Sequence, residues 1–60
     1  MIEKARRQAA IARLIKRGRI TTQAELIKEL RAAGVAVDQS TLSRDLTELG
    51  IRKSGGRYLR

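Results

Sequence analysis

Residues 38–50 read DQSTLSRDLTELG, and this stretch decides how the fold is built. Leu42, Leu46 and Leu49 are spaced i, i+4 and i+7, which places the three apolar side chains on one face of a helix. Gly50 follows where a left-handed residue commonly ends a helix. The sequence therefore predicts a helix that begins after Asp38, a favourable N-cap, and ends before Gly50.

The opposite face of this predicted helix is short and polar. Hydroxyl, amide and guanidinium groups are the donors and acceptors that read base edges in the major groove of DNA. We predict that four residues of this helix read bases, namely Gln39, Ser40, Ser43 and Arg44. A simpler interpretation stays open, in which Arg44 pairs with Glu48 at i+4 and the others are exposed polar residues.

A first helix is predicted over residues 4–17, which contain no Gly or Pro. Its apolar stripe consists of Ile11, Leu14 and Ile15. Gly18 follows as a helix stop, and the next residues, 19–21, form a short β-prone segment.

A second helix is predicted over residues 23–33. Thr22 and Glu25 have the spacing of a capping box, in which each side chain satisfies a free backbone N–H. The apolar stripe of this helix consists of Leu26, Ile27, Leu30 and Ala33. Gly34 ends the second helix in the way that Gly50 ends the third.

The last ten residues predict a β-hairpin around Ser54-Gly55-Gly56. A two-residue loop would pair Leu59 with Arg52, whereas a three-residue loop would pair Leu59 with Ile51. We favour the three-residue loop because it gives the hairpin one half-buried face. The order of elements, helix, short strand, helix, helix and hairpin, is that of a winged helix-turn-helix domain spanning residues 1–60, mainly α with a small β-hairpin.

Composition excludes several classes of protein. The chain has 60 residues, 42% of them hydrophobic, which is enough for one small core. It contains no Cys and no His, which rules out disulfides, zinc fingers and imidazole or thiol catalysis. Tyr58 is the only aromatic residue, which argues against a dedicated single-strand binder. Without a bilayer-length apolar run or a signal peptide, the sequence predicts a cytoplasmic protein.

Positive charge is concentrated at the two ends of the chain. The net charge is +8, with +6 in residues 1–20, −2 in residues 21–50 and +4 in residues 51–60. This distribution suits a polyanion that is gripped on two flanks. We predict that five residues contact the DNA backbone, namely Arg13, Thr22, Arg52, Lys53 and Arg57.

Other functions are weighed against DNA binding. A basic winged helix is also able to hold duplex RNA by its shape, and a basic surface is also able to meet an acidic protein. A membrane-surface helix is disfavoured because the first helix has a narrow apolar stripe and no aromatic anchor. An enzyme is the weakest alternative, since the acidic residues are scattered and no base, nucleophile and orienting group converge.

At residues 22–26 (TQAEL) and residues 39–50 (QSTLSRDLTELG), the chain resembles the N-terminal domain of bacterial arginine repressors. The resemblance extends from about Arg7 to Leu59. The Ser-Arg-Asp-Leu run also resembles that of other winged-helix regulators, but these usually leave the second helix through a shorter turn than residues 34–38.

The resemblance implies sequence-specific binding of palindromic operators that control arginine metabolism genes. It places the Ser-Arg pair of the family's recognition helix on Ser43 and Arg44, and the Gln that opens this helix on Gln39. It also implies a C-terminal domain that binds L-arginine as co-effector and assembles a hexamer. We expect these 60 residues to be a monomeric DNA-binding part of such a protein, with no cofactor or metal of their own.

Overall fold

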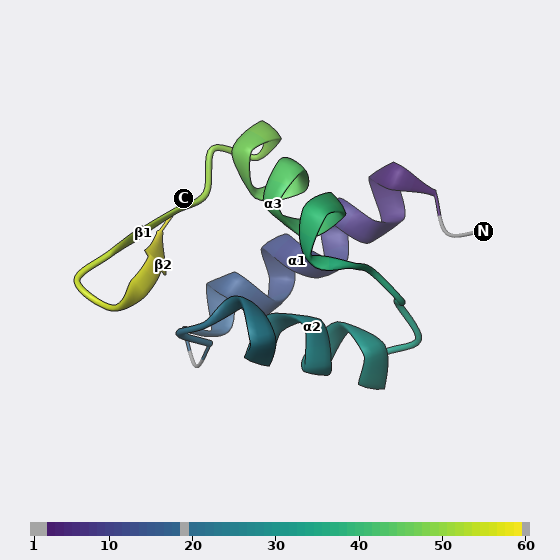
Figure 1. Cartoon of the computed structure of the whole chain (residues 1–60), viewed down its shortest axis with the longest axis horizontal. Helices are drawn as coiled ribbons and strands as arrows, with labels where there is room; N and C mark the ends of the chain where they lie inside the picture. The colour runs from purple at the N-terminus through teal and green to yellow at the C-terminus, as the bar shows by residue number, and fades with distance from the viewer. Residues whose placement is uncertain (1–2, 19, 60) are drawn as a thin grey trace.

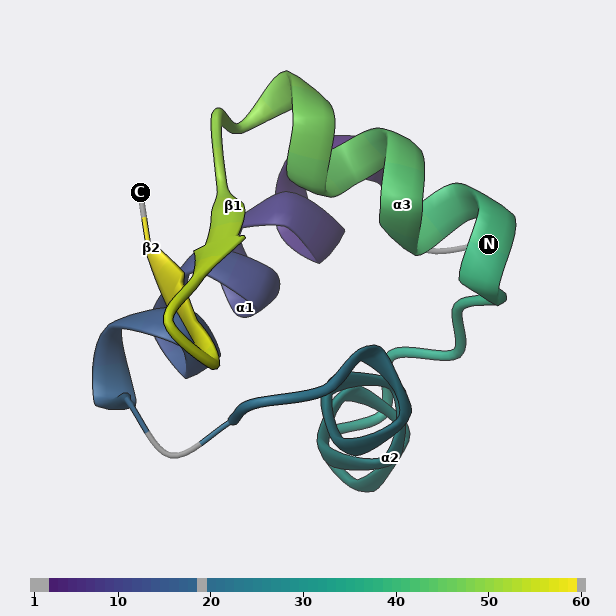
Figure 2. The same ribbon diagram turned by 60° about the vertical axis from the view of Figure 1, so that its left-hand side comes forward.

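The computed structural model describes residues 3–18 and 20–59, which form three helices followed by a two-stranded hairpin (Figure 1). The elements are α1 (Lys4–Arg17), α2 (Gln23–Ala32), α3 (Gln39–Glu48), β1 (Arg52–Ser54) and β2 (Arg57–Leu59). The three helices surround one core, with α2 in contact with both α1 and α3, and the hairpin, which we call the wing, follows the C-terminal end of α3 (Figures 1 and 2). This arrangement confirms the predicted winged helix-turn-helix fold.

Side-chain caps define where α2 and α3 begin. The backbone N–H of Glu25 donates to the Thr22 hydroxyl (3.1 Å), and the backbone N–H of Thr41 donates to Asp38 Oδ1 (2.7 Å). The carboxylate of Glu25 in turn accepts from the backbone N–H of Thr21 (3.3 Å). Each cap satisfies donors that the first turn of a helix leaves unpaired, which confirms both predicted starts.

The ends of α2 and α3 share one geometry. Gly34 and Gly50 have φ of 85° and 72°, and the residue after each glycine donates its N–H back to the helix, from Val35 to Leu30 (2.7 Å) and from Ile51 to Leu46 (2.9 Å). This is the Schellman motif, which brings an apolar residue just beyond the helix against its last turn. The predicted stops are therefore confirmed, with α2 ending one residue earlier than predicted.

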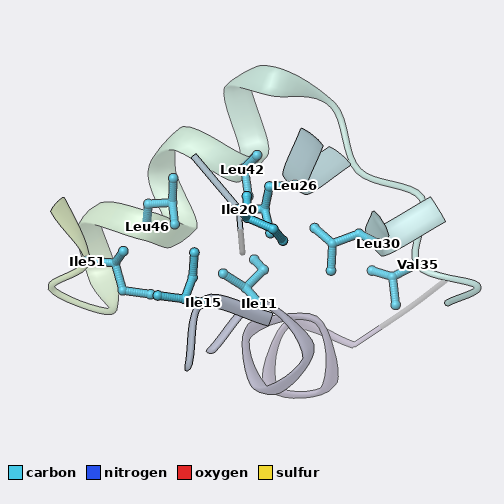
Figure 3. Close-up of a cluster of buried hydrophobic side chains, with 9 residues drawn as sticks. All are labelled: Ile11, Ile15, Ile20, Leu26, Leu30, Val35, Leu42, Leu46 and Ile51. Carbon is cyan, nitrogen blue, oxygen red and sulfur yellow. The ribbon is translucent and has the colours of Figure 1, made fainter. Parts of the chain in front are cut away.

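Nine buried side chains form the core between the helices (Figure 3). Each helix contributes two of them, and each segment that follows a helix contributes one more. They are Ile11 and Ile15, Leu26 and Leu30, Leu42 and Leu46, and then Ile20, Val35 and Ile51. The residue beyond each helix therefore closes the core that the helix stripes begin.

The predicted register of the wing is wrong. Arg52 pairs with Leu59 and Ser54 with Arg57, so the loop has two residues, Gly55 and Gly56, whose φ values are 58° and 78°. Two consecutive positive φ values suit a type I′ turn, whose twist matches that of the paired strands. The favoured three-residue loop required Ile51 to pair with Leu59, but Ile51 belongs to the end of α3 and is buried in the helical core.

The predicted short strand over residues 19–21 is also wrong for the part that the structure describes. Ile20 and Thr21 form no strand; Ile20 is buried in the core, and the N–H of Thr21 donates to the Glu25 carboxylate instead of to a neighbouring strand. Arg19, in the predicted short strand, and Arg60, at the end of the predicted hairpin, lie outside the described residues. Among residues 3–18 and 20–59, no helix has the length and hydropathy needed to cross a membrane.

Candidate nucleic-acid interface

α3 has one buried and one exposed face. Leu42 and Leu46 pack into the core, whereas all four residues predicted to read bases are exposed: Gln39, Ser40, Ser43 and Arg44. We call these four residues the outer face of α3. Because the N-cap, the leucine stripe and the Schellman motif define the same helix, they also determine which side chains point outward.

Arg44 is available on this face. The simpler interpretation paired it with Glu48, but Glu48 Oε1 accepts from Lys4 Nζ of α1 at 2.5 Å. Within residues 3–18 and 20–59, Arg44 has no ion-pair partner. A long exposed guanidinium with its donors unused is the group that most often contacts guanine in the major groove.

A negatively charged carboxylate, that of Asp38, caps the first turn of α3. The hydrogen bond from the Thr41 N–H holds the pKa of Asp38 below its usual range. Further along, the Thr47 hydroxyl donates to the carbonyl of Ser43 (3.1 Å), which turns Thr47 back along its own helix. Thr47 is therefore less suited to contact a base than Ser43.

The wing carries exposed cations. Arg52, Lys53 and Arg57 are all exposed, and Lys53 Nζ lies 5.8 Å from the centre of the Tyr58 ring. The Arg57 guanidinium reaches back to Gly18 at the end of α1. One of the cations predicted to contact DNA therefore lies beside the C-terminal end of α1.

A groove of about 530 Å³ separates α1 from the wing. Its lining includes Arg13 and Lys16 from α1 and Arg57 from β2. The structure thus brings together two predicted backbone contacts, Arg13 and Arg57, although they are far apart in the sequence. Like charges gathered without an acidic residue in the lining suit an anion such as phosphate.

Thr22 has a structural role in addition to its predicted one. Its hydroxyl accepts from the N–H of Glu25 and also lies 3.2 Å from Glu25 Oε1, to which it donates. The Glu25 carboxylate accepts hydrogen bonds from the hydroxyl and the backbone N–H of Thr21 and from the Thr22 hydroxyl, and these hold the pKa of Glu25 low. A hydroxyl engaged in this way reaches a phosphate only by giving up part of the cap.

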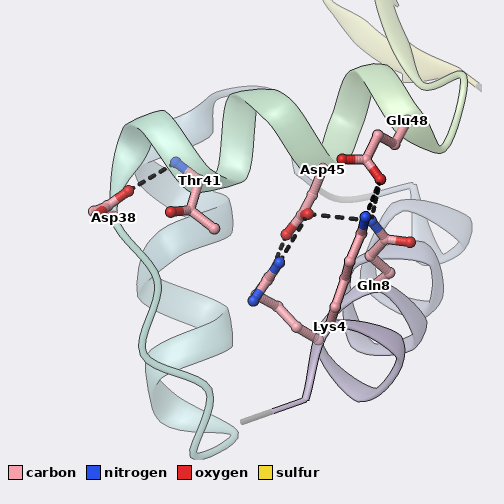
Figure 4. Close-up of polar contacts among 7 residues, drawn as sticks. Lys4, Gln8, Asp38, Thr41, Asp45 and Glu48 are labelled. Carbon is pink, nitrogen blue, oxygen red and sulfur yellow. Dashed lines mark hydrogen bonds and ion pairs between the residues drawn. The ribbon is translucent and has the colours of Figure 1, made fainter. Parts of the chain in front are cut away.

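Five residues join α1 to α3 through a polar network that the sequence analysis missed (Figure 4). Asp45 is 1% exposed, and its carboxylate accepts from Arg7 Nε, from Arg7 Nη2 (3.0 Å) and from Gln8 Nε2 (3.1 Å). The ion pair of Lys4 with Glu48 lies beside it. We call these residues, Lys4, Arg7, Gln8, Asp45 and Glu48, the α1–α3 bridge.

The bridge favours the charged forms of the groups that compose it. Hydrogen bonding from Arg7 lowers the pKa of Asp45, and the same bond raises the pKa of Arg7. Asp45 was detectable in the sequence, since it lies three residues after Leu42 and therefore within the buried stripe. A buried carboxylate needs a partner, and Arg7 and Lys4 are consequently engaged within the domain rather than available to DNA.

Three helices, a basic wing and an exposed polar face on the last helix define a winged helix-turn-helix domain of the DNA-binding class. A family model described as "Arginine repressor, DNA binding domain" matches residues 2–58. The chain therefore belongs to the arginine repressor DNA-binding domain family. This is a family of transcriptional regulators and not of enzymes.

Several similar proteins are named arginine repressor. The chain is 57% identical over 51 residues to an arginine repressor of Desulforudis audaxviator, covering 85% of this chain and 34% of that protein. It is 47% identical over 53 residues to an arginine repressor of Anaeromyxobacter sp. (strain Fw109-5), covering 88% of this chain and 34% of that protein. It is 45% identical over 53 residues to one of Thermus thermophilus, covering 88% of this chain and 32% of that protein.

The chain thus spans about a third of the length of the curated relatives that it matches. Among solved structures, none matches this chain significantly.

Proposed function

We propose that residues 1–60 are the operator-recognition domain of an arginine-responsive transcriptional regulator of arginine metabolism genes. In this proposal α3 enters the major groove of double-stranded DNA, and Gln39, Ser40, Ser43 and Arg44 contact base edges. The observation that carries the proposal is the exposure of Arg44 on a helix whose other face is held in the core. Membership of the arginine repressor family supports the class of target.

The backbone contacts form the second part of the proposal. Arg52 and Lys53 of the wing, and the groove cations Arg13 and Arg57, would neutralise phosphates without reading sequence. Thr22 would contribute at the start of α2, next to the backbone N–H groups that a helix N-terminus offers to an anion. The four exposed cations support this role more directly than the hydroxyl of Thr22, which already serves as a cap.

The first experiment selects bound sites from random duplex DNA with the wild-type chain and with Arg44→Ala. We expect one enriched motif for the wild type, and loss of preference at one position of the motif for the variant, at about 1–3 kcal/mol. Arg31→Ala is the matched control, because Arg31 is also exposed but lies on α2. An unchanged motif for Arg44→Ala would contradict the role of α3, and tighter binding of matched duplex RNA would favour the RNA alternative.

The second experiment measures affinity as a function of salt. Replacing Arg52 or Arg57 by Ala should weaken binding to all sequences alike and reduce the slope of log affinity against log salt by about 1. A change in base preference without a change in slope would contradict the backbone role of the wing.

The proposal extends to the longer protein of which the relatives are examples. There, L-arginine would act as co-effector and the chain would assemble as a homohexamer on palindromic operators, through residues outside this domain. The isolated domain would be a monomer that binds a half-site weakly. Gel-shift titration on duplexes with one and two half-sites tests this, since a monomer gains no cooperativity from the second site.

A further inference from the structure

The α1–α3 bridge holds α3 in a way that the apolar core does not. Leu42 and Leu46 bury apolar surface, and this stabilisation is non-directional. The guanidinium of Arg7 instead donates two hydrogen bonds to the carboxylate of Asp45, and paired hydrogen bonds of this kind constrain both angle and distance. The bridge therefore restrains the rotation of α3 about its own axis.

Asp45 and Arg44 are neighbours in the sequence, and their side chains leave α3 about 100° apart. Asp45 points to α1 and is buried, whereas Arg44 is exposed on the outer face. A rotation that moves Asp45 away from Arg7 moves Ser43 and Arg44 by the same angle. The bridge is thus coupled to the direction in which the outer face points.

Stability alone does not account for the bridge. Replacing a buried ion pair by apolar residues of similar volume is often neutral or stabilising, because the apolar residues have no desolvation penalty. The side chain of Asp45 is 2% exposed and that of Arg7 is 18% exposed, so the carboxylate carries most of this penalty. What the ion pair supplies and apolar residues do not is a defined geometry.

From this geometry we infer that Arg7 and Asp45 are positioning residues of the recognition helix, which determine sequence specificity without touching DNA. The inference rests on the proposed DNA-binding function. It predicts that the Arg7–Asp45 ion pair contributes to the preference for the correct sequence over any other, and not to the affinity for DNA in general.

The test uses the double variant Arg7→Met/Asp45→Leu, which removes one positive and one negative charge and leaves the net charge at +8. Its affinity is measured on the duplex that the wild-type chain enriches and on a scrambled duplex of equal composition. We expect a folded variant whose ratio of the two affinities falls about tenfold, while its affinity for the scrambled duplex stays within about twofold. A helical circular dichroism spectrum and a cooperative thermal transition establish that the variant is folded.

Lys4→Met/Glu48→Leu is the matched control, because it is also charge-neutral and removes the exposed ion pair of the same bridge, with side chains 59% and 39% exposed. We expect its affinity ratio to stay within about twofold of that of the wild type. If the first variant does not fold, Arg7→Lys serves in its place, since lysine keeps the charge but lacks the planar fork; we expect a fall of about threefold.

The outcomes separate the inference from the function on which it rests. A folded bridge variant, either Arg7→Met/Asp45→Leu or the substitute Arg7→Lys, whose affinity ratio equals that of the wild type overturns the positioning role and leaves the proposed function standing. An equal loss in the control variant also overturns it, because the effect would then not belong to Arg7 and Asp45. A wild-type chain that does not distinguish the two duplexes overturns the proposed function and the inference together.

Discussion

The helical core and the wing are built by different means. In α2 and α3, caps, apolar stripes and Schellman motifs all specify the same positions, and all three helices contribute side chains to one core. In the wing, two three-residue strands are joined by a glycine turn, and apart from Tyr58 their side chains are exposed. Several independent interactions therefore determine the structure of the core, whereas the position of the wing depends on its glycine turn and on the packing of Tyr58.

This contrast suits the two roles that we propose for these regions. A helix that reads bases has to be held rigidly, because readout depends on hydrogen-bond geometry. A wing that meets phosphates needs charge at the right place but tolerates small movements, since the phosphate contact is largely electrostatic. Four comparisons test whether the two regions differ as much as their structures indicate.

The largest difference in stability is expected between a leucine-to-alanine substitution in the core and the same substitution in the wing. Leu26→Ala removes a fully buried side chain and should lower the free energy of unfolding by about 2–5 kcal/mol. Leu59→Ala removes a side chain that is 44% exposed and should change it by no more than about 0.5 kcal/mol. Urea denaturation measures both, and similar losses would show that the wing is part of the cooperative core.

The next effect concerns the buried carboxylate of the bridge. Arg7→Met leaves Asp45 with only Gln8 as a donor from α1 among the described residues, and should lower the free energy of unfolding by about 3 kcal/mol. Arg6→Met, at an exposed position next to it, is the control and should have little effect. Thermal denaturation of the two variants compares them, and equal midpoints would mean that water replaces Arg7 without penalty.

A smaller effect is expected from the turn of the wing. Gly55 has a φ of 58°, a conformation that costs other residues about 1 kcal/mol, so Gly55→Ala should destabilise the hairpin by that amount. Because the wing is weakly joined to the core, amide exchange should quicken in β1 and β2 and stay unchanged in α2. Faster exchange in α2 would show that the hairpin supports the helices.

The weakest effect is expected from pH, since it is confined to acid solution. The native pKa of Asp45 lies below its ordinary value of 3.8, so its contribution to stability is complete well above that pH and is lost as the pH falls through the lower native value. Urea denaturation at about pH 6 and about pH 3 should show a larger loss for the wild type than for Arg7→Met/Asp45→Leu. Equal losses would place the acid sensitivity in the exposed carboxylates instead.

Much of the fold could be predicted from sequence because its signals are local. The starts at Thr22 and Asp38 and the stops at Gly34 and Gly50 each depend on residues within one helical turn. The register of the wing was not predicted correctly. The favoured pairing gave the hairpin a half-buried face by assuming that Ile51 belonged to it. The hydrogen bond of Ile51 to Leu46 makes it the last residue of the helical core instead.

The candidate site was predictable to a similar degree. The exposed face of α3 follows from the leucine stripe, so Ser43 and Arg44 could be placed from periodicity alone. The convergence of Arg13 with Arg57, and of Arg7 with Asp45, could not, because each pair joins residues that are distant in the sequence. Which residues contact DNA stays a prediction.

The single aromatic ring of the chain has a practical consequence. Tyr58 is partly buried against the core from within the wing, and no other Tyr, Trp or Phe is present in the sequence. Burial against the core raises the pKa of its hydroxyl, and detachment of the wing would expose the ring to solvent. Intrinsic ultraviolet fluorescence should therefore report detachment of the hairpin alone, without an attached dye, while the peptide absorption bands follow the melting of the helices.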